Sequence, residues 1–254
     1  RPPPRSTLLP YTTLFRSEQI FLTAGAQQGL SLLSHLLIEP GEQVMTETLT
    51  YTGMLRIISP LHPEIVAVPT SRKDGIDLDA LEQLLRAGAR PAFIYLVTDG
   101  HNPLGIRLSL EKREYLATLL RRYRVTLIED DPYGFLAYEP ALPPIRALEE
   151  RQVLYVGSFS KILAPALRIG WIVLPEELGT KMSTVKDAMD LDSATFAQHV
   201  AAQFLQQEDF PAHLRMLQEG YRQRRDITGA ALQRHMPAGV QWQQPESGMY
   251  FRSE

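Results

Sequence analysis

The chain has 254 residues, a net charge of −3 and no cysteine. This length allows one large domain and part of a second, and the slight negative charge gives no support to binding nucleic acid or a membrane surface. The lack of cysteine excludes disulfides and thiolate catalysis and fits a reducing cytoplasm, where we expect the protein to reside. No apolar run approaches the length of a membrane span and the six histidines form no metal-binding pattern, so we expect neither a membrane segment nor a metal site.

Residues 1–17 differ in character from the rest of the chain. Four of the first ten residues are proline, which excludes a helix there, and no continuous apolar core follows the basic residues, as a signal peptide would require. We interpret residues 1–17 as a leader that is foreign to the fold, disordered or derived from an adaptor or vector sequence. A genuine flexible leader is the alternative.

From residue 18 onward, short apolar runs alternate with amphipathic segments. We predict seven strands, over residues 19–23, 43–47, 65–68, 92–97, 125–128, 153–156 and 169–174. Helices are predicted after the turn at 24–29, after Tyr51, over 77–87 with Asp77 as N-cap, and after Ser109. Continuous apolar strands between amphipathic helices are typical of a mainly parallel sheet covered on both faces. The short link between the last two strands predicts one antiparallel strand.

The chain beyond the last strand is predicted to be mostly helical. Helices are expected over residues 176–189, 195–207 and 211–235, and residues 240–251 begin what we interpret as a strand pair. We therefore divide the chain into the leader (1–17), a large domain over residues 18–207, and the start of a truncated small domain over residues 208–254.

The candidate chemistry centres on Lys161, which comes shortly after the strand at 153–156. Burial among small and apolar neighbours disfavours the ammonium form of a lysine, which is the condition an amine needs to attack a carbonyl and form a Schiff base. Ser158, Ser160 and Arg168 can hold a phosphate dianion, the arginine by forked charge-assisted hydrogen bonds. A Schiff-base lysine beside a phosphate site indicates pyridoxal phosphate. A strand end with an incidental surface lysine is the alternative.

Other candidate residues follow strands at the same edge of the sheet, where ligands bind in folds of this kind. Gly25, Ala26 and Gln27 lie between a strand and a helix start, so free backbone N–H groups and the helix dipole make an anion site there. Tyr51 can stack on a planar heterocycle or simply pack in the core. Asn102 can donate to a phenolic oxygen, or serve only the Asn-Pro turn in which it lies.

Three carboxylates, Glu129, Asp130 and Asp131, follow the strand that we predict to end at Ile128. Buried charges must be paired, and a carboxylate against a protonated pyridine nitrogen is such a pair. This pair keeps the ring cationic and able to accept electrons. Tyr133 comes soon after and can reach the ring's phenolic oxygen. A metal site is the rival interpretation of the acidic run, but further ligands are lacking elsewhere in the sequence.

At these positions the sequence resembles the fold-type I, class I and II aminotransferases, which depend on pyridoxal 5′-phosphate. The resemblance is closest to the branch that holds 2-aminoadipate and aromatic aminotransferases and the aminotransferase-like domains of MocR-type regulators. It runs from about residue 18 to residue 254 and rests on the stretches 130–133, 158–161 and 168–171. It implies an α/β fold, an aspartate aminotransferase-like large domain with a mainly parallel seven-stranded sheet between helices, and an incomplete C-terminal small domain.

The resemblance also implies roles for single residues. Lys161 would be the Schiff-base lysine and proton shuttle, Asp130 the partner of the pyridine nitrogen, and Tyr51 the stacking ring. Tyr133 and Asn102 would bond the phenolic oxygen, with Tyr133 counted among the catalytic residues. The phosphate would be held around Gly25 by Ala26, Gln27, Ser158, Ser160 and Arg168.

Two stretches depart from the family's pattern. The usual Asn-Pro-Thr-Gly reads Asn-Pro-Leu-Gly at 102–105 and is preceded by His101, where glutamine is common. The sequence Ser-Gly-Met-Tyr at 247–250 stands where two glycines and Met-Phe are usual. We find no counterpart of the family's N-terminal segment, which closes over the substrate. We also find no complete small domain with the arginine that grips the substrate carboxylate. We therefore expect a fragment of an aminotransferase.

The implied function is transfer of an amino group from an L-amino acid to a 2-oxo acid through the Lys161 Schiff base. Amino acids and 2-oxo acids are the expected partners, with no nucleic acid or membrane bound through this chain, and the intact parent is expected to be a homodimer. We expect poor activity from the fragment because its carboxylate clamp is absent. Two alternatives remain: the ligand-sensing domain of a MocR/GntR-type transcription regulator, which needs a winged helix-turn-helix before residue 18, and a pyridoxal-phosphate-dependent lyase on the same fold.

Overall fold

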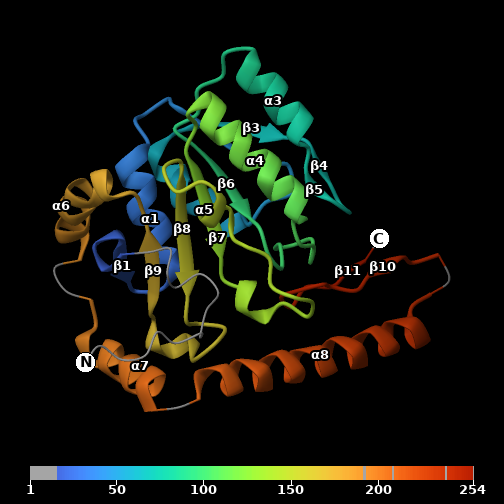
Figure 1. Ribbon diagram of the computed structural model, residues 1–254. Coiled ribbons are helices and arrows are strands. Elements are labelled where there is room, and N and C mark those ends of the chain that lie inside the picture. Colours follow the sequence, from blue (N-terminus) through green and yellow to red (C-terminus); the bar gives the residue numbers. More distant parts are fainter. Residues whose placement is uncertain (1–15, 191–192, 208, 238, 254) are drawn as a thin grey trace.

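The apolar runs of the sequence become the strands of one sheet in the computed structural model, which describes residues 16–190, 193–207, 209–237 and 239–253. The sheet has seven strands in the order β1-β9-β8-β7-β6-β2-β3 (Figure 1). Their bounds are β1 Ile20–Thr23, β2 Gln43–Glu47, β3 Glu64–Val68, β6 Phe93–Val97, β7 Leu127–Asp131, β8 Val153–Ser158 and β9 Gly170–Val173. The predicted mainly parallel seven-stranded sheet is confirmed. The proposed leader lies outside the described residues, apart from its last two.

One strand runs against the others, as the short link predicted. The pairs β3-β2, β2-β6, β6-β7 and β7-β8 are parallel, whereas β9 is antiparallel to both of its neighbours, β8 and β1. The link from β8 to β9 holds only the 3-10 turn η4 (Pro165–Leu167). A parallel connection needs a longer crossover, usually with a helix, so the chain turns back instead.

Helices cover the two faces of the sheet (Figure 1). One face carries α1 (Ala26–Leu37), α2 (Thr52–Ile58) and α6 (Gly179–Met189), and the other carries α3 (Leu78–Arg86), α4 (Leu110–Tyr123) and α5 (Ile145–Leu148). Alternate residues of β6 enter the two cores, because successive side chains of a strand point to opposite faces. Phe93, Tyr95 and Val97 join the core with α1, and Ile94 and Leu96 join the core with α4.

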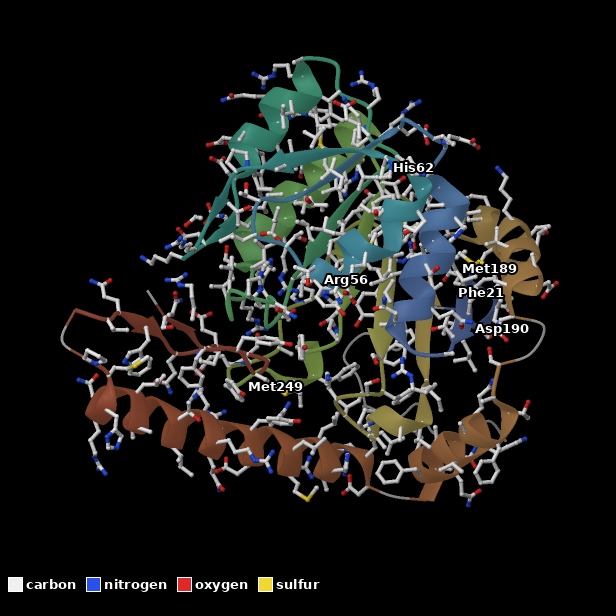
Figure 2. The ribbon with its side chains drawn as sticks, turned by 180° about the vertical axis from the view of Figure 1, so that it is seen from behind. Phe21, Arg56, His62, Met189, Asp190 and Met249 are labelled. Carbon is white, nitrogen blue, oxygen red and sulfur yellow. The ribbon has the colours of Figure 1, made fainter. Side chains whose placement is uncertain are left out.

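The C-terminal part crosses the end of the sheet at which β7 and β8 finish (Figure 1). It consists of α7 (Thr195–Gln207), α8 (Phe210–His235) and the antiparallel pair β10 (Trp242–Gln243) and β11 (Arg252–Ser253). Asp209 is the N-cap of α8, because its carboxylate accepts from the Ala212 N–H at 3.0 Å. Met249 lies between α8 and the body of the sheet (Figure 2) and packs in a cluster with Tyr133, Leu136 and Phe210.

One part of the sheet is less covered than the sequence predicted. Between the β1–β9 edge and α8 lies an apolar hollow of about 610 Å³. Its lining includes Ile20, Leu22, Phe135, Trp171, Val173, Phe210 and Leu214. Ile20 and Leu22 on the edge strand β1 remain 40% and 38% exposed, so the helices that flank the sheet leave this edge partly open.

Some short elements carried no sequence signal. The hairpin of β4 (Thr70–Ser71) and β5 (Gly75–Ile76) and the single turn of α5 are too brief for a hydrophobic period to reveal them. The described helices include none that combines the length and apolar character needed to cross a membrane.

The N-cap of α3 provides a test of the local folding signals. The Asp77 carboxylate accepts from the backbone N–H groups of Asp79 and Ala80, both at 3.0 Å. We expect Asp77→Ala to lower the free energy of unfolding by about 1 kcal/mol, because those two donors lose their partner. Urea unfolding followed by circular dichroism measures this. Asp79→Ala removes a neighbouring exposed carboxylate that makes no cap, and an equal loss in that variant would contradict the capping account.

Candidate active site

The strand-end residues selected from the sequence meet in one cavity of about 260 Å³. Because parallel strands end at the same edge of the sheet, loops distant in sequence converge there. The cavity is lined by Ala26, Gln27, Leu30, Tyr51, Val97, Asn102, Asp130, Pro132, Tyr133, Ser158, Ser160, Lys161, Arg168 and Tyr250. Every predicted site residue is in this set except Gly25, which is the N-cap of α1 next to Ala26.

The three carboxylates lie inside β7 and not beyond its end, which corrects the predicted strand boundary. They therefore alternate between the faces of the sheet, and only Asp130 lines the cavity. On the other face Glu129 accepts from the backbone N–H groups of Ile145 and Arg146 at 2.8 and 2.9 Å. Asp131 accepts from the Tyr155 hydroxyl at 2.8 Å, and burial raises its pKa to about 7.

Asp130 has one satisfied and one unsatisfied carboxylate oxygen. The Tyr95 hydroxyl donates to Oδ2 at 2.7 Å, whereas no described residue donates to the buried Oδ1. Burial raises the pKa of Asp130 to about 6, and the hydrogen bond from Tyr95 partly offsets that rise. A buried acceptor without a donor is costly, so this oxygen is suited to a cationic N–H group in the cavity.

The start of α1 and the loop after β8 form a cradle for an anion. Gly25 has φ +85°, and a Cβ there would collide with the Arg168 guanidinium, so glycine is needed for the close approach. Arg168 donates to the Ala24 carbonyl at 3.2 Å and to the Ser160 Oγ at 3.4 Å. The Ser160 N–H in turn donates to Ser158 Oγ at 3.1 Å. The guanidinium thus faces the helix N-terminus, which favours negative charge between them.

Lys161 lines the cavity from the turn that follows β8. The side chain is half-buried, so the full burial on which the sequence argument relied is not present. Its amine has no hydrogen-bond or ion-pair partner among the residues that the structure describes, which leaves the nitrogen free to meet a ligand. Tyr51 stands nearby with its ring against Gly53, where a Cβ would overlap the ring atoms. Burial and the Asp130 charge raise the pKa of the Tyr51 hydroxyl.

Sequence reasoning missed two polar features of the site, the Tyr250 hydroxyl and a buried pair of side chains. The Tyr250 hydroxyl accepts from Asn102 Nδ2 at 3.2 Å and lies 2.9 Å from the Tyr133 hydroxyl. Burial and this hydrogen bond raise the pKa of Tyr133. The departure from Phe to Tyr in the stretch 247–250 was the available signal. It did not by itself identify position 250 as part of the site, because the hydroxyl's partners are distant in sequence.

The second missed group is a buried pair behind Asn102. Glu47, at the end of β2, contacts His101 with 2.7 Å between Oε2 and Nε2. Because the Leu104 N–H donates to His101 Nδ1 at 3.4 Å, the ring proton belongs on Nε2 and is donated to Glu47. The pair ties the Asn102 turn to the neighbouring strand.

The rival metal interpretation of the acidic run at 129–131 gains no support, since the described residues hold no group of three or more candidate ligands.

Comparison with known proteins agrees with this geometry. The sequence pattern of the family "Aminotransferase class I and II" matches residues 7–254. The chain is 36% identical over 238 residues to aromatic-amino-acid aminotransferase 1 of Thermococcus litoralis, covering 91% of this chain and 57% of that protein. It is 34% identical to an HTH-type transcriptional regulator of Escherichia coli, covering 92% of this chain and 50% of that protein.

Solved structures share the fold. The α-aminoadipate aminotransferase LysN of Thermus thermophilus, in complex with N-(5′-phosphopyridoxyl)-L-leucine, superposes with a TM-score of 0.90 at 32% identity. That match covers 94% of this chain and 62% of LysN. The chain thus spans between half and three fifths of the length of the two curated relatives described above.

The raised pKa of Asp130 gives a test by stability. The carboxyl titrates near its ordinary value of 3.8 in the unfolded chain and near 6 in the fold, so the unfolded chain releases the proton first. The free energy of unfolding therefore falls by about 2–3 kcal/mol as the pH rises from about 4 to above 6. In Asp130→Asn the side-chain carbonyl still accepts from Tyr95. We expect the free energy of unfolding of this variant to lack the decrease with pH that Asp130 causes, and the variant to be more stable than the parent at pH 7.5.

Urea unfolding at several pH values between 4.5 and 7.5 measures the difference. Asp187→Asn serves as the control because it removes an exposed carboxylate on α6. An Asp130→Asn variant that is less stable than the parent at every pH would mean that the carboxylate is paired in the fold and not under strain from burial.

Proposed function

The chain belongs to the class I and II aminotransferase family, and we propose that it binds pyridoxal 5′-phosphate in the cavity described above. The observation that carries the proposal is Oδ1 of Asp130, which is buried and lacks a donor among the described residues. A protonated ring nitrogen would supply that donor and the compensating positive charge. The same cavity holds the amine of Lys161 and the anion cradle of Arg168 and the start of α1.

We assign each part of the ligand to groups that can hold it. The phosphate would lie against the first turn of α1, Ser158, Ser160 and Arg168, and the ring against Tyr51. Asn102 and Tyr133 would donate to the phenolic oxygen. When bound, pyridoxal phosphate supplies an aldehyde that bonds to amines and a ring that withdraws electrons.

The protein's own groups then handle charge and protons. With a pKa of about 6, Asp130 is largely ionised at neutral pH, and a cationic partner favours the ionised form further. Lys161 is the residue with an amine among those that line the cavity, so we assign to its Nζ the removal and return of the proton on the substrate's α-carbon. Tyr133, beside Asn102, is assigned the role of orienting the acceptor oxygen.

We propose that the complete protein moves an amino group from an L-amino acid to a 2-oxo acid. Support comes from the aminotransferases among its relatives, and the activity is that of the whole protein because the chain spans only part of their length. A cytoplasmic homodimer, and a division into a large domain to residue 207 and a small domain from residue 208, are also proposals. They rest on the family resemblance.

A second candidate is a ligand-sensing domain of a transcription regulator. The similarity to the HTH-type regulator of Escherichia coli favours it, since that match covers 92% of this chain. Turnover separates the two candidates. An aminotransferase consumes an amino acid and a 2-oxo acid together, a sensor binds the cofactor without sustained turnover, and release of ammonia would indicate a lyase.

The cofactor proposal is tested by absorption spectroscopy of the purified chain with added pyridoxal phosphate. We expect a visible band that survives dialysis, and borohydride should fix the cofactor to the chain. Lys161→Ala should lose both properties, because the amine that bonds the aldehyde is gone. Lys181→Ala, an exposed lysine on α6, should behave like the parent. A stable band in Lys161→Ala, or borohydride labelling at another lysine, would refute the assignment.

The phosphate cradle is tested by comparing two ligands. We expect Arg168→Ala to weaken binding of pyridoxal phosphate about tenfold to a hundredfold, the effect of losing charge-assisted hydrogen bonds to a dianion. Binding of pyridoxal, which lacks the phosphate, should change less than about twofold. Arg151→Ala removes an exposed arginine and is the matched control. Equal losses for both ligands would show that Arg168 acts on the loop's folding and not on the phosphate.

A further inference from the structure

Residues 245–250 form a strap that crosses from the C-terminal part to the mouth of the cavity. The strap is held by backbone and side-chain contacts with the turn after β7. The Tyr138 N–H donates to the Glu246 carbonyl at 3.1 Å, the Tyr138 hydroxyl donates to the Gly248 carbonyl at 2.6 Å, and Ala137 forms a β-bridge with Ser247. These contacts fix the strap before it reaches the cavity.

Two glycines bring the strap against the Asn102 turn. A Cβ on Gly100 would lie 2.8 Å from the Gly248 Cα, and a Cβ on Gly248 would lie 2.9 Å from the Gly100 Cα. Both residues also have positive φ, +58° and +71°. The two backbones therefore touch, and the position of Tyr250 is set by main-chain packing and not by its own side chain alone.

One of the two hydrogen bonds of the Tyr250 hydroxyl has a defined direction. Asn102 Nδ2 can only donate, so the Tyr250 oxygen accepts from it at 3.2 Å. The Tyr250 and Tyr133 hydroxyl oxygens lie 2.9 Å apart, and either hydroxyl can be the donor between them. When a ligand oxygen accepts from Tyr133, the Tyr250 proton is donated to the Tyr133 oxygen, and Asn102 keeps its second amide hydrogen for the ligand. Both side chains line the cavity.

We propose that Tyr250 is a positioning residue whose hydroxyl orients Asn102 and Tyr133 so that both donate to one acceptor in the cavity, the phenolic oxygen of pyridoxal phosphate. This inference rests on the proposed function. A phenylalanine, which the resemblance gives as usual at this position, has the same ring and cannot make either hydrogen bond. Linked hydrogen bonds strengthen one another, so the hydroxyl also makes Tyr133 a better donor.

The charge of the bound ligand would report this role. Donors favour the ionised form of the oxygen that accepts from them, so weaker donation raises the pH at which the bound ligand loses its proton. Other groups that face the same cavity also act on that pH. They are Tyr51 after β2, Asp130 on β7, and Lys161 and Arg168 after β8. A change at Tyr250 leaves all four in place.

The experiment is a pH titration of the visible absorption of the full chain loaded with pyridoxal phosphate, with a dissociation constant measured at one pH. We expect Tyr250→Phe to raise the titration midpoint by roughly half a unit and to weaken binding about threefold to tenfold. Tyr115→Phe is the matched control, because its hydroxyl bonds Glu82 away from the cavity. Tyr138→Phe, which loosens the strap, should move the midpoint in the same direction by less.

An unchanged midpoint in Tyr250→Phe would overturn the inference. A lower midpoint or tighter binding would also overturn it, since that result would mean that Tyr250 competes with the ligand for its donors. A parent chain that binds no pyridoxal phosphate would overturn the proposed function and this inference together. A parent chain that binds it while Tyr250→Phe behaves like Tyr115→Phe would overturn the inference alone.

Discussion

Burial of three consecutive carboxylates in the central strand β7 is the constraint on which this structure depends. Each ionised oxygen needs a donor once water is gone, and the two faces of the sheet meet that need differently. On one face, the first N–H groups of α5 serve Glu129, and Tyr155 and the turn at Gly134 serve Asp131. The cavity face offers Asp130 one protein donor. The protein thus supplies donors to both carboxylates on one side of the sheet, whereas on the other side one oxygen of Asp130 has no donor among the described residues.

Buried ion pairs and hydrogen bonds also hold the Asn102 turn in place. Asp99, on the near side of the turn, accepts from Arg107 and Arg113, each at 2.7 Å, and Arg113 is fully buried. His101 is tied to Glu47 of a neighbouring strand. Charged and polar pairs therefore fix the loop from helix α4 and strand β2 at once. The Asn102 side chain, which lines the cavity, therefore has little conformational freedom. A binding group requires such a fixed position.

Local signals in the sequence predicted the sheet, most of the helices and the loops of the cavity. Strand periodicity, helix caps and strand-end chemistry each act over a few residues, so one sequence reveals them. The remaining features depend on distant contacts. The Tyr250 hydroxyl meets Asn102 from 148 positions away, and Glu47 meets His101 from 54 positions away. The end of β7 was misplaced because acidic residues rarely continue a buried strand unless partners elsewhere satisfy them. The roles of the cavity residues stay predictions.

The open apolar hollow beside β1 has a practical consequence for handling this polypeptide. Environment-sensitive dyes become fluorescent when they enter apolar surface, and in most folded proteins such surface appears only on melting. Here the native fold already presents it, with Ile20, Leu22 and Trp171 in the lining. Dye fluorescence would start high before any heating, so a dye-based thermal-shift assay would misjudge folding. Intrinsic tryptophan emission or calorimetry would follow the transition without that background.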